Sequence, residues 1–211
     1  MSKKFIAIAG NVGVGKSTLT EKLAAHFGWT AFYEAVDDNP YLADFYRDMK
    51  TWSFHSQIFF LSRRLRHHKD LMRHPNHVVQ DRTVYEDAEI FAANLYRQGN
   101  MHERDYRSYR ELYEVMVELL PPPSLMVYLK ASVPTLLRRI AKRGREFEQD
   151  IDPQYLELLN GLYNAWIDGF NLCPVLTINA DRLNFVQSAD DFSEIAAQIS
   201  ARLEKSHTDT L

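Results

Sequence analysis

The chain has 211 residues, a length that suits one domain with a full-sized hydrophobic core. Hydrophobic residues make up 45% of the chain and charged residues 25%, which are ordinary values for a globular protein. No apolar stretch is long enough to span a bilayer, so a membrane is not expected as a partner. The formal net charge of −3 argues against a broad nucleic-acid-binding surface, so a nucleic acid is not expected either. A single cysteine, Cys173, excludes an intrachain disulfide framework, fits a cytoplasmic location, and is expected to be a small buried residue rather than a nucleophile.

Short apolar runs alternate with helical patterns along the chain. The first half is predicted to form, in order, a strand at Lys4–Ala9, a helix at Lys16–Phe27, a strand at Thr30–Tyr33, a short helix from Asn39 to Met49, a long helix at Trp52–Met72 and a strand at His77–Gln80. The second half is predicted to form helices at Tyr85–Arg97 and Glu103–Leu119, a strand at Ser124–Lys130, helices at Pro134–Arg143 and Pro153–Phe170, a strand at Val175–Asn179 and a helix at Asp190–Leu203.

Strands that alternate with helices predict an α/β fold. The pattern predicts a parallel five-stranded sheet flanked by helices on both faces, within a single domain over residues 1–205 that is followed by a polar tail at 206–211. In such sheets, ligands bind at the carboxyl ends of the strands. Polar residues at those ends are therefore the first candidates for a functional site.

The segment between the first strand and the first helix matches the phosphate-binding pattern G-x-x-x-x-G-K-[ST]. Its glycines let backbone N–H groups point at phosphate oxygens, its lysine contacts the β- and γ-phosphates, and its serine hydroxyl can ligate Mg²⁺. A plain turn between a strand and a helix is the alternative, but the eight-residue match in this context favours a nucleoside triphosphate site. The residues assigned to this site are Gly10, Asn11, Val12, Gly13, Val14, Gly15, Lys16, Ser17 and the following Thr18.

Two carboxylates follow other predicted strands. Glu34 comes after the second strand, where it could take a proton from an acceptor hydroxyl. Asp81 comes after the third strand, where an acid commonly helps to hold Mg²⁺, and the adjacent Arg82 could reach the transferring phosphoryl group. The alternatives are a surface carboxylate at Glu34 and a local ion pair at Asp81.

Cations gather at the end of the helix that begins at Pro134. Arg139 and Arg143 are four residues apart and share a helix face, and Gly144 then permits a mobile cover, over about residues 143–152, that carries Arg145. A lid of this kind would neutralise phosphoryl charge and exclude water from the reaction. A solvated basic helix end is the alternative.

The long helix carries Gln57 and Arg64, which are seven residues and thus two turns apart on one face. A glutamine on an apolar, aromatic-rich helix suits bidentate recognition of a nucleobase edge. An ordinary half-exposed polar residue is the alternative for Gln57 when it is considered by itself.

Together these residues resemble the deoxynucleoside kinase family over nearly the whole chain. The segments that carry the resemblance are Tyr33-Glu34, Asn39-Pro40-Tyr41, Trp52-Ser53-Phe54, Asp81-Arg82-Thr83 with Asp87, and Arg143-Gly144-Arg145. The bacterial deoxyadenosine/deoxycytidine kinase branch is the most similar. The resemblance implies a P-loop kinase fold with an arginine-bearing lid, ATP and Mg²⁺ as cofactors, and a role in nucleotide salvage.

The resemblance also implies a role for each matching residue. Glu34 would be the base for the 5′-hydroxyl, Arg82 would contact Glu34 and the 5′-oxygen, and Lys16, Arg143 and Arg145 would stabilise the developing charge. Asp81 and Ser17 would hold magnesium, and Arg139 and Arg143 would contact ATP. The deoxynucleoside would be bound by Gln57, Arg64, Asp87 and Phe91 at the base and by Tyr46 and Glu148 at the 3′-hydroxyl. Phe147 stands where some relatives carry a second acid, which weakens the case for Glu148.

The Arg64–Asp87 pair bears on the substrate. Family members with a charged pair there favour purines or cytosine, because a carboxylate accepts from an exocyclic amine that thymine lacks. Deoxyadenosine and deoxycytidine are therefore the expected acceptors, with deoxyguanosine next. The resemblance further implies a homodimer through the helices Trp52–Met72 and Glu103–Leu119.

Two other functions fit the phosphate loop. A nucleoside monophosphate kinase, such as a thymidylate kinase, would need a cationic pocket for the acceptor phosphate, which Arg82 and Arg64 could supply. A nucleotide-dependent switch would need no acceptor, but a guanine-reading Asn-Lys-x-Asp run is absent from the sequence.

Overall fold

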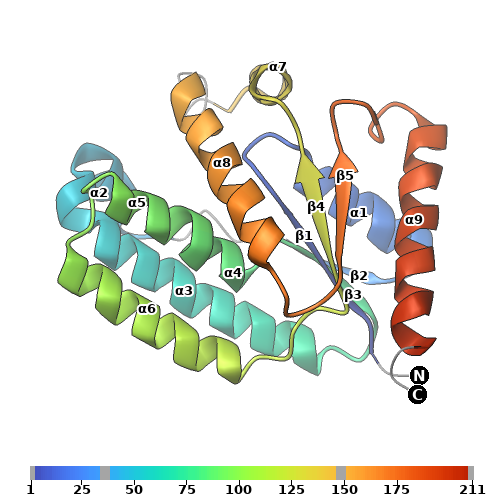
Figure 1. Ribbon diagram of the computed structural model, residues 1–211, viewed down its shortest axis with the longest axis horizontal. Helices are drawn as coiled ribbons and strands as arrows, with labels where there is room; N and C mark the ends of the chain where they lie inside the picture. The colour runs from blue at the N-terminus through green and yellow to red at the C-terminus, as the bar shows by residue number, and fades with distance from the viewer. Residues whose placement is uncertain (1–2, 34–38, 146–150, 209–211) are drawn as a thin grey trace. The chain divides into compact units, whose positions relative to one another are not determined.

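The computed structural model describes residues 3–33, 39–145 and 151–208. The chain divides into two compact units, each assembled from separate segments (Figure 1). The first, called here the sheet unit, comprises Met1–Tyr33, Pro75–Arg82 and Pro122–Leu211, and the second, the helical unit, comprises Glu34–His74 and Thr83–Pro121. That residues 1–205 act as a single domain stays a prediction.

The sheet unit is built on five parallel strands in the order β2-β3-β1-β4-β5. The central strand β1 is buried along its whole length, and its neighbours β3 and β4 are almost entirely buried, as expected for strands covered on both faces. The predicted parallel five-stranded sheet is thus confirmed. The strands are β1 (Phe5–Gly10), β2 (Thr30–Phe32), β3 (Val78–Asp81), β4 (Leu125–Lys130) and β5 (Val175–Asn179).

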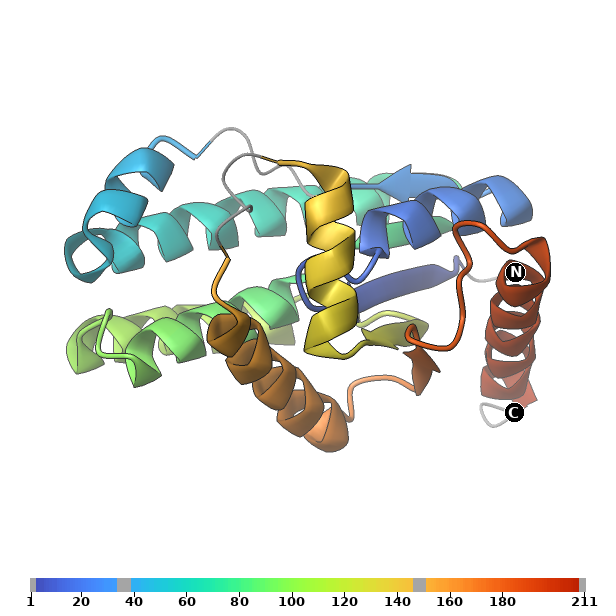
Figure 2. The same cartoon turned by 90° about the horizontal axis from the view of Figure 1, so that it is seen from above.

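Helices cover both faces of this sheet, as predicted. Figures 1 and 2 show α1 and α8 on opposite sides of β1 and β4. Alternate strand residues explain this arrangement: Ile8 and Val127 belong to the core that includes α1 and α9, whereas Tyr128 points to the other face and stacks on Tyr163 of α8 at 5.9 Å between ring centroids. The helices of the sheet unit are α1 (Lys16–Phe27), α7 (Val133–Arg143), α8 (Pro153–Gly169) and α9 (Ala189–Thr208).

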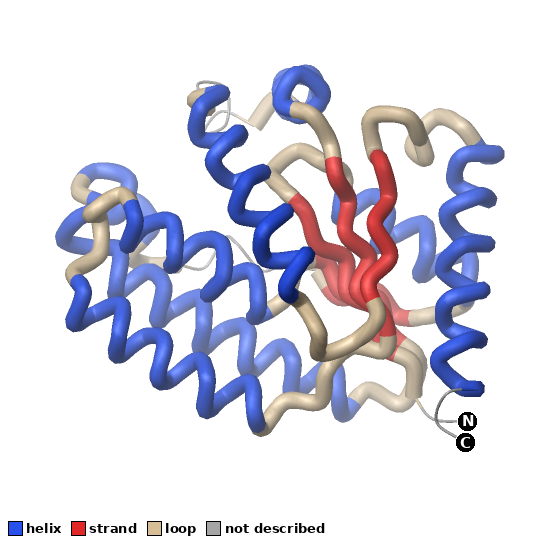
Figure 3. Tube along the Cα trace, in the orientation of Figure 1, coloured by secondary structure: helices blue, strands red, loops and turns tan. Residues whose placement is uncertain are grey.

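The helical unit packs its long helix α3 against α6 and against the segment that follows Thr83 (Figure 3). The side of α3 that carries Ser53, Gln57, Arg64, His68 and Leu71 is buried. The segments of this unit are α2 (Leu42–Arg47), α3 (Met49–Arg73), α4 (Val84–Glu86), the π-helical turn η1 (Asp87–Ala92), α5 (Ala93–Arg97) and α6 (Glu103–Glu118).

Two predictions about helices were wrong. The regular helix expected at Tyr85–Arg97 is interrupted by the π turn η1, a geometry that residue-by-residue helix propensity does not predict. The last helix was expected to end at Leu203 and continues to Thr208, since Glu204 and Lys205 are good helix formers that carry the exposed turn onward. Among the described residues, no helix combines the length and apolarity that a membrane span requires.

Candidate functional site

The phosphate loop follows β1 and packs too closely for side chains at two of its glycines. Gly10 has φ +146°, and a Cβ there would lie 2.6 Å from the carbonyl oxygen of Leu129. Gly13 has φ +78°, and a Cβ there would lie 2.6 Å from Cγ1 of Ile140 on α7. Glycine is therefore required both by the backbone conformation and by the contact with neighbouring elements.

Asn11 anchors this loop, a role that sequence reasoning missed. Its side-chain oxygen accepts a hydrogen bond from the Val12 N–H at 2.7 Å. Its Nδ2 donates to the carbonyl of Leu156 and to Oδ1 of Asn160, both at 2.9 Å, so the loop is tied to α8. Asn160 in turn donates to the carbonyl of Ala131 at 3.0 Å, just beyond β4. The sequence motif leaves this position open to any residue, so the motif holds no signal for the contact.

Lys16, Ser17 and Asp81 lie together, as the sequence predicted. The Lys16 Nζ donates to the carbonyls of Gly10 and Asn11 at 2.8 and 3.2 Å. The Ser17 hydroxyl donates to Oδ2 of Asp81 at 2.5 Å. Within the described part of the chain, the other carboxylate oxygen of Asp81 is buried and meets no hydrogen-bond donor. A hydroxyl beside a carboxylate with an unsatisfied oxygen is a donor set that fits Mg²⁺, which prefers oxygen ligands.

Arg82 adopts a backbone conformation that is costly for a bulky residue. Its φ of +63° lies in the left-handed region, which costs about 1–3 kcal/mol at a non-glycine residue. Its N–H donates to the carbonyl of Ile8 in β1 at 3.0 Å, which holds the chain in place where β3 ends. Backbone strain of this kind clusters at functional sites, so it supports a functional role for this arginine.

A capping box starts α4 directly after Arg82. The Thr83 N–H donates to Oε2 of the fully buried Glu86 at 2.9 Å, and the Thr83 hydroxyl lies 3.4 Å from the same oxygen. The run Thr83-Val84-Tyr85-Glu86 has the T-x-x-E spacing of a capping box, so the sequence contained a signal for this feature. The box fixes the start of the segment that carries Asp87.

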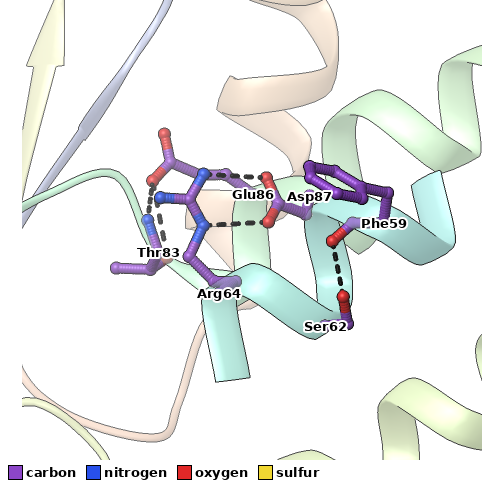
Figure 4. Close-up of polar contacts among 6 residues, drawn as sticks. All are labelled: Phe59, Ser62, Arg64, Thr83, Glu86 and Asp87. Atoms are coloured by element: carbon purple, nitrogen blue, oxygen red, sulfur yellow. Dashed lines mark hydrogen bonds and ion pairs between the residues drawn. The ribbon is translucent and has the colours of Figure 1, made fainter. Parts of the chain in front are cut away.

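Arg64 and Asp87 form a buried ion pair in the helical unit (Figure 4). The Arg64 Nε donates to Oδ2 of Asp87 at 3.0 Å, and Nη2 faces Oδ1 at 3.4 Å, so the guanidinium engages both carboxylate oxygens. Their side chains are only 4% and 6% exposed. Gln57 is also buried on α3, Phe91 is half-buried on η1, and Tyr46 on α2 is exposed.

The arginines of α7 differ in their surroundings. Arg139 is half-buried, and its Nη1 and Nη2 donate to the carbonyls of Val14 and Ala180 at 2.6 and 2.7 Å. Burial lowers the pKa of Arg139 below its usual value. Arg143 and Arg145 are exposed on either side of Gly144, which ends the helix at φ +70°. Arg139 therefore links the phosphate loop to the segment after β5, whereas the other two face solvent.

Two predicted site residues, Glu34 and Glu148, lie outside the described residues, as do residues 146–150 of the predicted lid. The remaining predicted residues divide between the units. The sheet unit brings together the phosphate loop, Asp81 and Arg139, and the helical unit pairs Arg64 with Asp87. Their roles toward ligands stay predictions.

Comparisons with known proteins point to one family. The model of the deoxynucleoside kinase family matches residues 6–204. A deoxyadenosine/deoxycytidine kinase of Bacillus subtilis (strain 168) is 41% identical over 198 residues, covering 93% of this chain and 91% of the relative. A deoxyguanosine kinase of the same organism is 37% identical over 199 residues, covering 92% of this chain and 95% of the relative.

Solved structures agree with the sequence matches. The structure of deoxyadenosine kinase from M. mycoides with bound dATP superposes with a TM-score of 0.80 at 32% identity, covering 93% of this chain and 99% of that one. The same enzyme with the products dCMP and a flexible dCDP bound gives a TM-score of 0.81 at 31% identity, with the same coverage. The phosphate loop and the parallel sheet agree with these matches, which extend along nearly the whole chain. The chain therefore belongs to the deoxynucleoside kinase family.

Proposed function

We propose that this chain transfers the γ-phosphoryl group of ATP to the 5′-hydroxyl of a deoxynucleoside. The observation that carries the proposal is the cluster of Lys16, Ser17 and Asp81 at the phosphate loop, in a chain of the deoxynucleoside kinase family. Phosphoryl transfer depends on positioning and on neutralising charge on the phosphoryl oxygens. In the sheet unit, the buried Lys16 beside the Ser17–Asp81 pair would supply both the positioning and the charge neutralisation.

Magnesium is proposed as the companion of ATP. The Ser17 hydroxyl and the Asp81 carboxylate would hold it, since one oxygen of Asp81 is buried without a donor among the described residues. When bound, the ion would offset the negative charge of the phosphate oxygens. The anchoring of the loop by Asn11 and Arg139 supports the role, because it fixes the backbone whose N–H groups would bind the phosphates.

The acceptor is proposed to be deoxyadenosine or deoxycytidine in preference, and deoxyguanosine after them. The buried Arg64–Asp87 pair supports this choice: a carboxylate accepts from an exocyclic amine, and the arginine donates to a ring nitrogen or carbonyl. Relatives named for all three nucleosides agree with a base site of this chemistry. Gln57 and Phe91 are assigned to the base, and Tyr46 and Glu148 to the 3′-hydroxyl.

For the chemical step we assign the base to Glu34, which would accept the proton of the 5′-hydroxyl. Arg82, Arg143 and Arg145 would stabilise charge on the transferring group together with Lys16. The strained backbone at Arg82 supports its place in this set, because such strain is maintained where a side chain must be aimed. Arg143 and Arg145 are exposed and thus accessible to a ligand.

A coupled assay of ADP release tests the proposal directly. It compares deoxyadenosine, deoxycytidine, deoxyguanosine and thymidine, and sets deoxyadenosine against its monophosphate. We expect turnover with the first three and little with thymidine or the monophosphate. Preference for the monophosphate would support a nucleoside monophosphate kinase instead. A rate of ADP release that does not change when any of the nucleosides is added would support a nucleotide-dependent switch.

The variant Glu34→Gln tests the proposed base. It should keep ATP binding and lower kcat by about 10²–10⁴-fold, the usual contribution of a general base. ATP binding is measured by isothermal titration and kcat by the same coupled assay. Turnover close to that of the wild type would remove Glu34 from the mechanism.

We also propose a homodimer that uses the exposed side of α6, in a cytoplasmic protein. Leu112 and Val115 on this helix, with Leu119 just after it, are large apolar residues that are exposed at helical spacing. Light scattering should give twice the chain mass, and Val115→Glu should give monomers. A monomeric wild type at micromolar concentration would contradict the dimer.

A further inference from the structure

The segment that carries Asp87 and Phe91 is wound as a π turn. In η1 the N–H of Ala93 donates to the carbonyl of Ala88, five residues earlier, instead of following the α-helical pattern. Such turns account for well under 1% of residues and are frequent at functional sites. A π turn holds one residue more than an α turn, so relaxation to a regular helix would rotate one flank by roughly 100° relative to the other.

Two ion pairs hold η1 from different helices. Asp87, its first residue, is bound by Arg64 of α3 at 3.0 Å. Glu89, two residues later, is bound by Nη1 of Arg110 of α6 at 2.7 Å. Residues two apart on a helix point in nearly opposite directions, so the two bridges hold the turn from opposite sides.

The contact from α6 is partly buried and well supported. Arg110 and Glu89 have side chains 25% and 30% exposed, and the guanidinium lies over the ring of Tyr113 at 5.0 Å. Arg110 also donates to Glu114 at 3.3 Å. Burial acts to lower the pKa of Arg110, but the hydrogen bond and the charge of Glu89, together with Tyr106 and Tyr113, outweigh burial and raise that pKa above the usual value.

A tyrosine from the same helix connects this contact with the inner pair. Tyr109 precedes Arg110 on α6 and is completely buried, and within the described residues its hydroxyl has no hydrogen-bond partner. Burial and then the charge of Asp87 raise the pKa of Tyr109 well above its usual value, while the positive charge of Arg64 acts in the opposite sense. The side chains of α6 therefore reach the electrostatic environment of Arg64 and Asp87.

We propose that Glu89 and Arg110 are positioning residues for base selection: their ion pair keeps η1 wound as a π turn and thereby fixes the Asp87 carboxylate against Arg64. The inference rests on the proposed role of Arg64 and Asp87 in reading the base. Neither Glu89 nor Arg110 needs to touch the nucleoside, because their effect is transmitted through the register of η1. The purine and cytosine preference then depends on α6 as well as on α3.

The test uses Glu89→Gln, which keeps the shape of the side chain and removes its charge. We expect KM for deoxyadenosine to rise about ten-fold while kcat and the KM for ATP stay within about two-fold, and the preference for deoxyadenosine over thymidine in kcat/KM to fall about ten-fold. Arg110→Met should give the same pattern. The charge swap Glu89→Arg with Arg110→Glu should restore much of the preference.

The matched control is Arg107→Met. Arg107 lies about one turn earlier on α6 and bridges Glu103 of the same helix at 3.0 Å, and those side chains are 69% and 71% exposed. This variant should leave KM and the preference unchanged. Circular dichroism and thermal melting check that each variant is folded; if one of Glu89→Gln and Arg110→Met is not, the other removes the same ion pair and carries the test.

Asp87→Asn separates failure of this inference from failure of the proposed base site. If Asp87→Asn alters the preference and folded Glu89→Gln and Arg110→Met do not, the role of the α6 contact is refuted and the base site stands. If none of the three alters the preference, Arg64 and Asp87 do not read the base. A uniform loss of kcat for all nucleosides in Glu89→Gln would indicate a merely structural bridge and would also overturn the inference.

Discussion

Asp87→Asn should strongly destabilise the folded chain, because it removes the carboxylate charge that pairs with the buried Arg64 guanidinium. The two side chains are 4% and 6% exposed, so solvent screening offsets little of the loss. Opposite charges about 4 Å apart attract by about 4 kcal/mol at the effective dielectric constant of a protein, and removal of one partner from a buried pair costs about 3–5 kcal/mol. Both values indicate a large effect from a change of one atom.

Thermal melting measures this loss. For chains of this length each 1 kcal/mol lowers Tm by about 2–4 °C, so Asp87→Asn should lower Tm by about 6–20 °C. The double variant Arg64→Met with Asp87→Leu replaces both charges with apolar groups and should recover most of that decrease. The single variants Arg64→Met and Asp87→Leu complete the cycle with the double variant, and the coupling energy of that cycle measures the interaction between the two side chains.

Glu103→Gln is the matched control for this experiment. Glu103 meets Arg107 at the same N···O distance of 3.0 Å, but both side chains are about 70% exposed. Exposed pairs of this spacing contribute about 0.3–0.5 kcal/mol, so Tm should fall by no more than about 2 °C. A decrease in Asp87→Asn as small as that of the control would refute the argument that burial makes the Arg64–Asp87 pair strong.

Three further outcomes follow from the sheet unit. Gly10→Ala should lower the free energy of unfolding, measured in urea, by about 1–3 kcal/mol, because φ is +146° and the added Cβ would lie 2.6 Å from the backbone oxygen of Leu129. The control Gly161→Ala adds a Cβ with no atom within 4 Å and should not destabilise the chain. Equal effects of the two variants would contradict the close packing at Gly10. Arg139→Met should raise KM for ATP about ten-fold and leave KM for the nucleoside unchanged in steady-state kinetics, because the phosphate loop loses the hydrogen bond that Arg139 donates to the Val14 carbonyl. A parallel rise in both KM values would argue against a specific role of Arg139 at the loop. Cys173 should react with iodoacetamide at pH 8 roughly 10³-fold more slowly than a free thiol, because burial raises its pKa to about 12 and keeps the thiol protonated. Alkylation at the rate of a cysteine in a model peptide would refute this prediction.

The sequence alone was sufficient for the features that depend on neighbouring residues. The phosphate loop follows from eight consecutive residues, and the strands follow from short apolar runs, so the parallel sheet and the position of Asp81 beside Ser17 were predicted correctly. The spacing of apolar residues indicates which face of a helix or strand is buried, and this spacing can be read from neighbouring residues alone. It also explains why the ends of elements were off by only a few residues in most cases.

Tertiary structure alone decided the features that depend on distant partners. The bond from Arg139 to Val14 joins residues 125 positions apart, and the bond from Asn11 to Asn160 joins residues 149 apart. The π turn at Asp87 is likewise absent from the local pattern, because its own residues read as an ordinary helix, and its two carboxylates are bound by arginines of the distant helices α3 and α6. Hydrogen bonds and ion pairs of this kind form only where folding brings two groups within about 3 Å. A linear pattern specifies which groups are available, and the packing of the elements determines which of them meet.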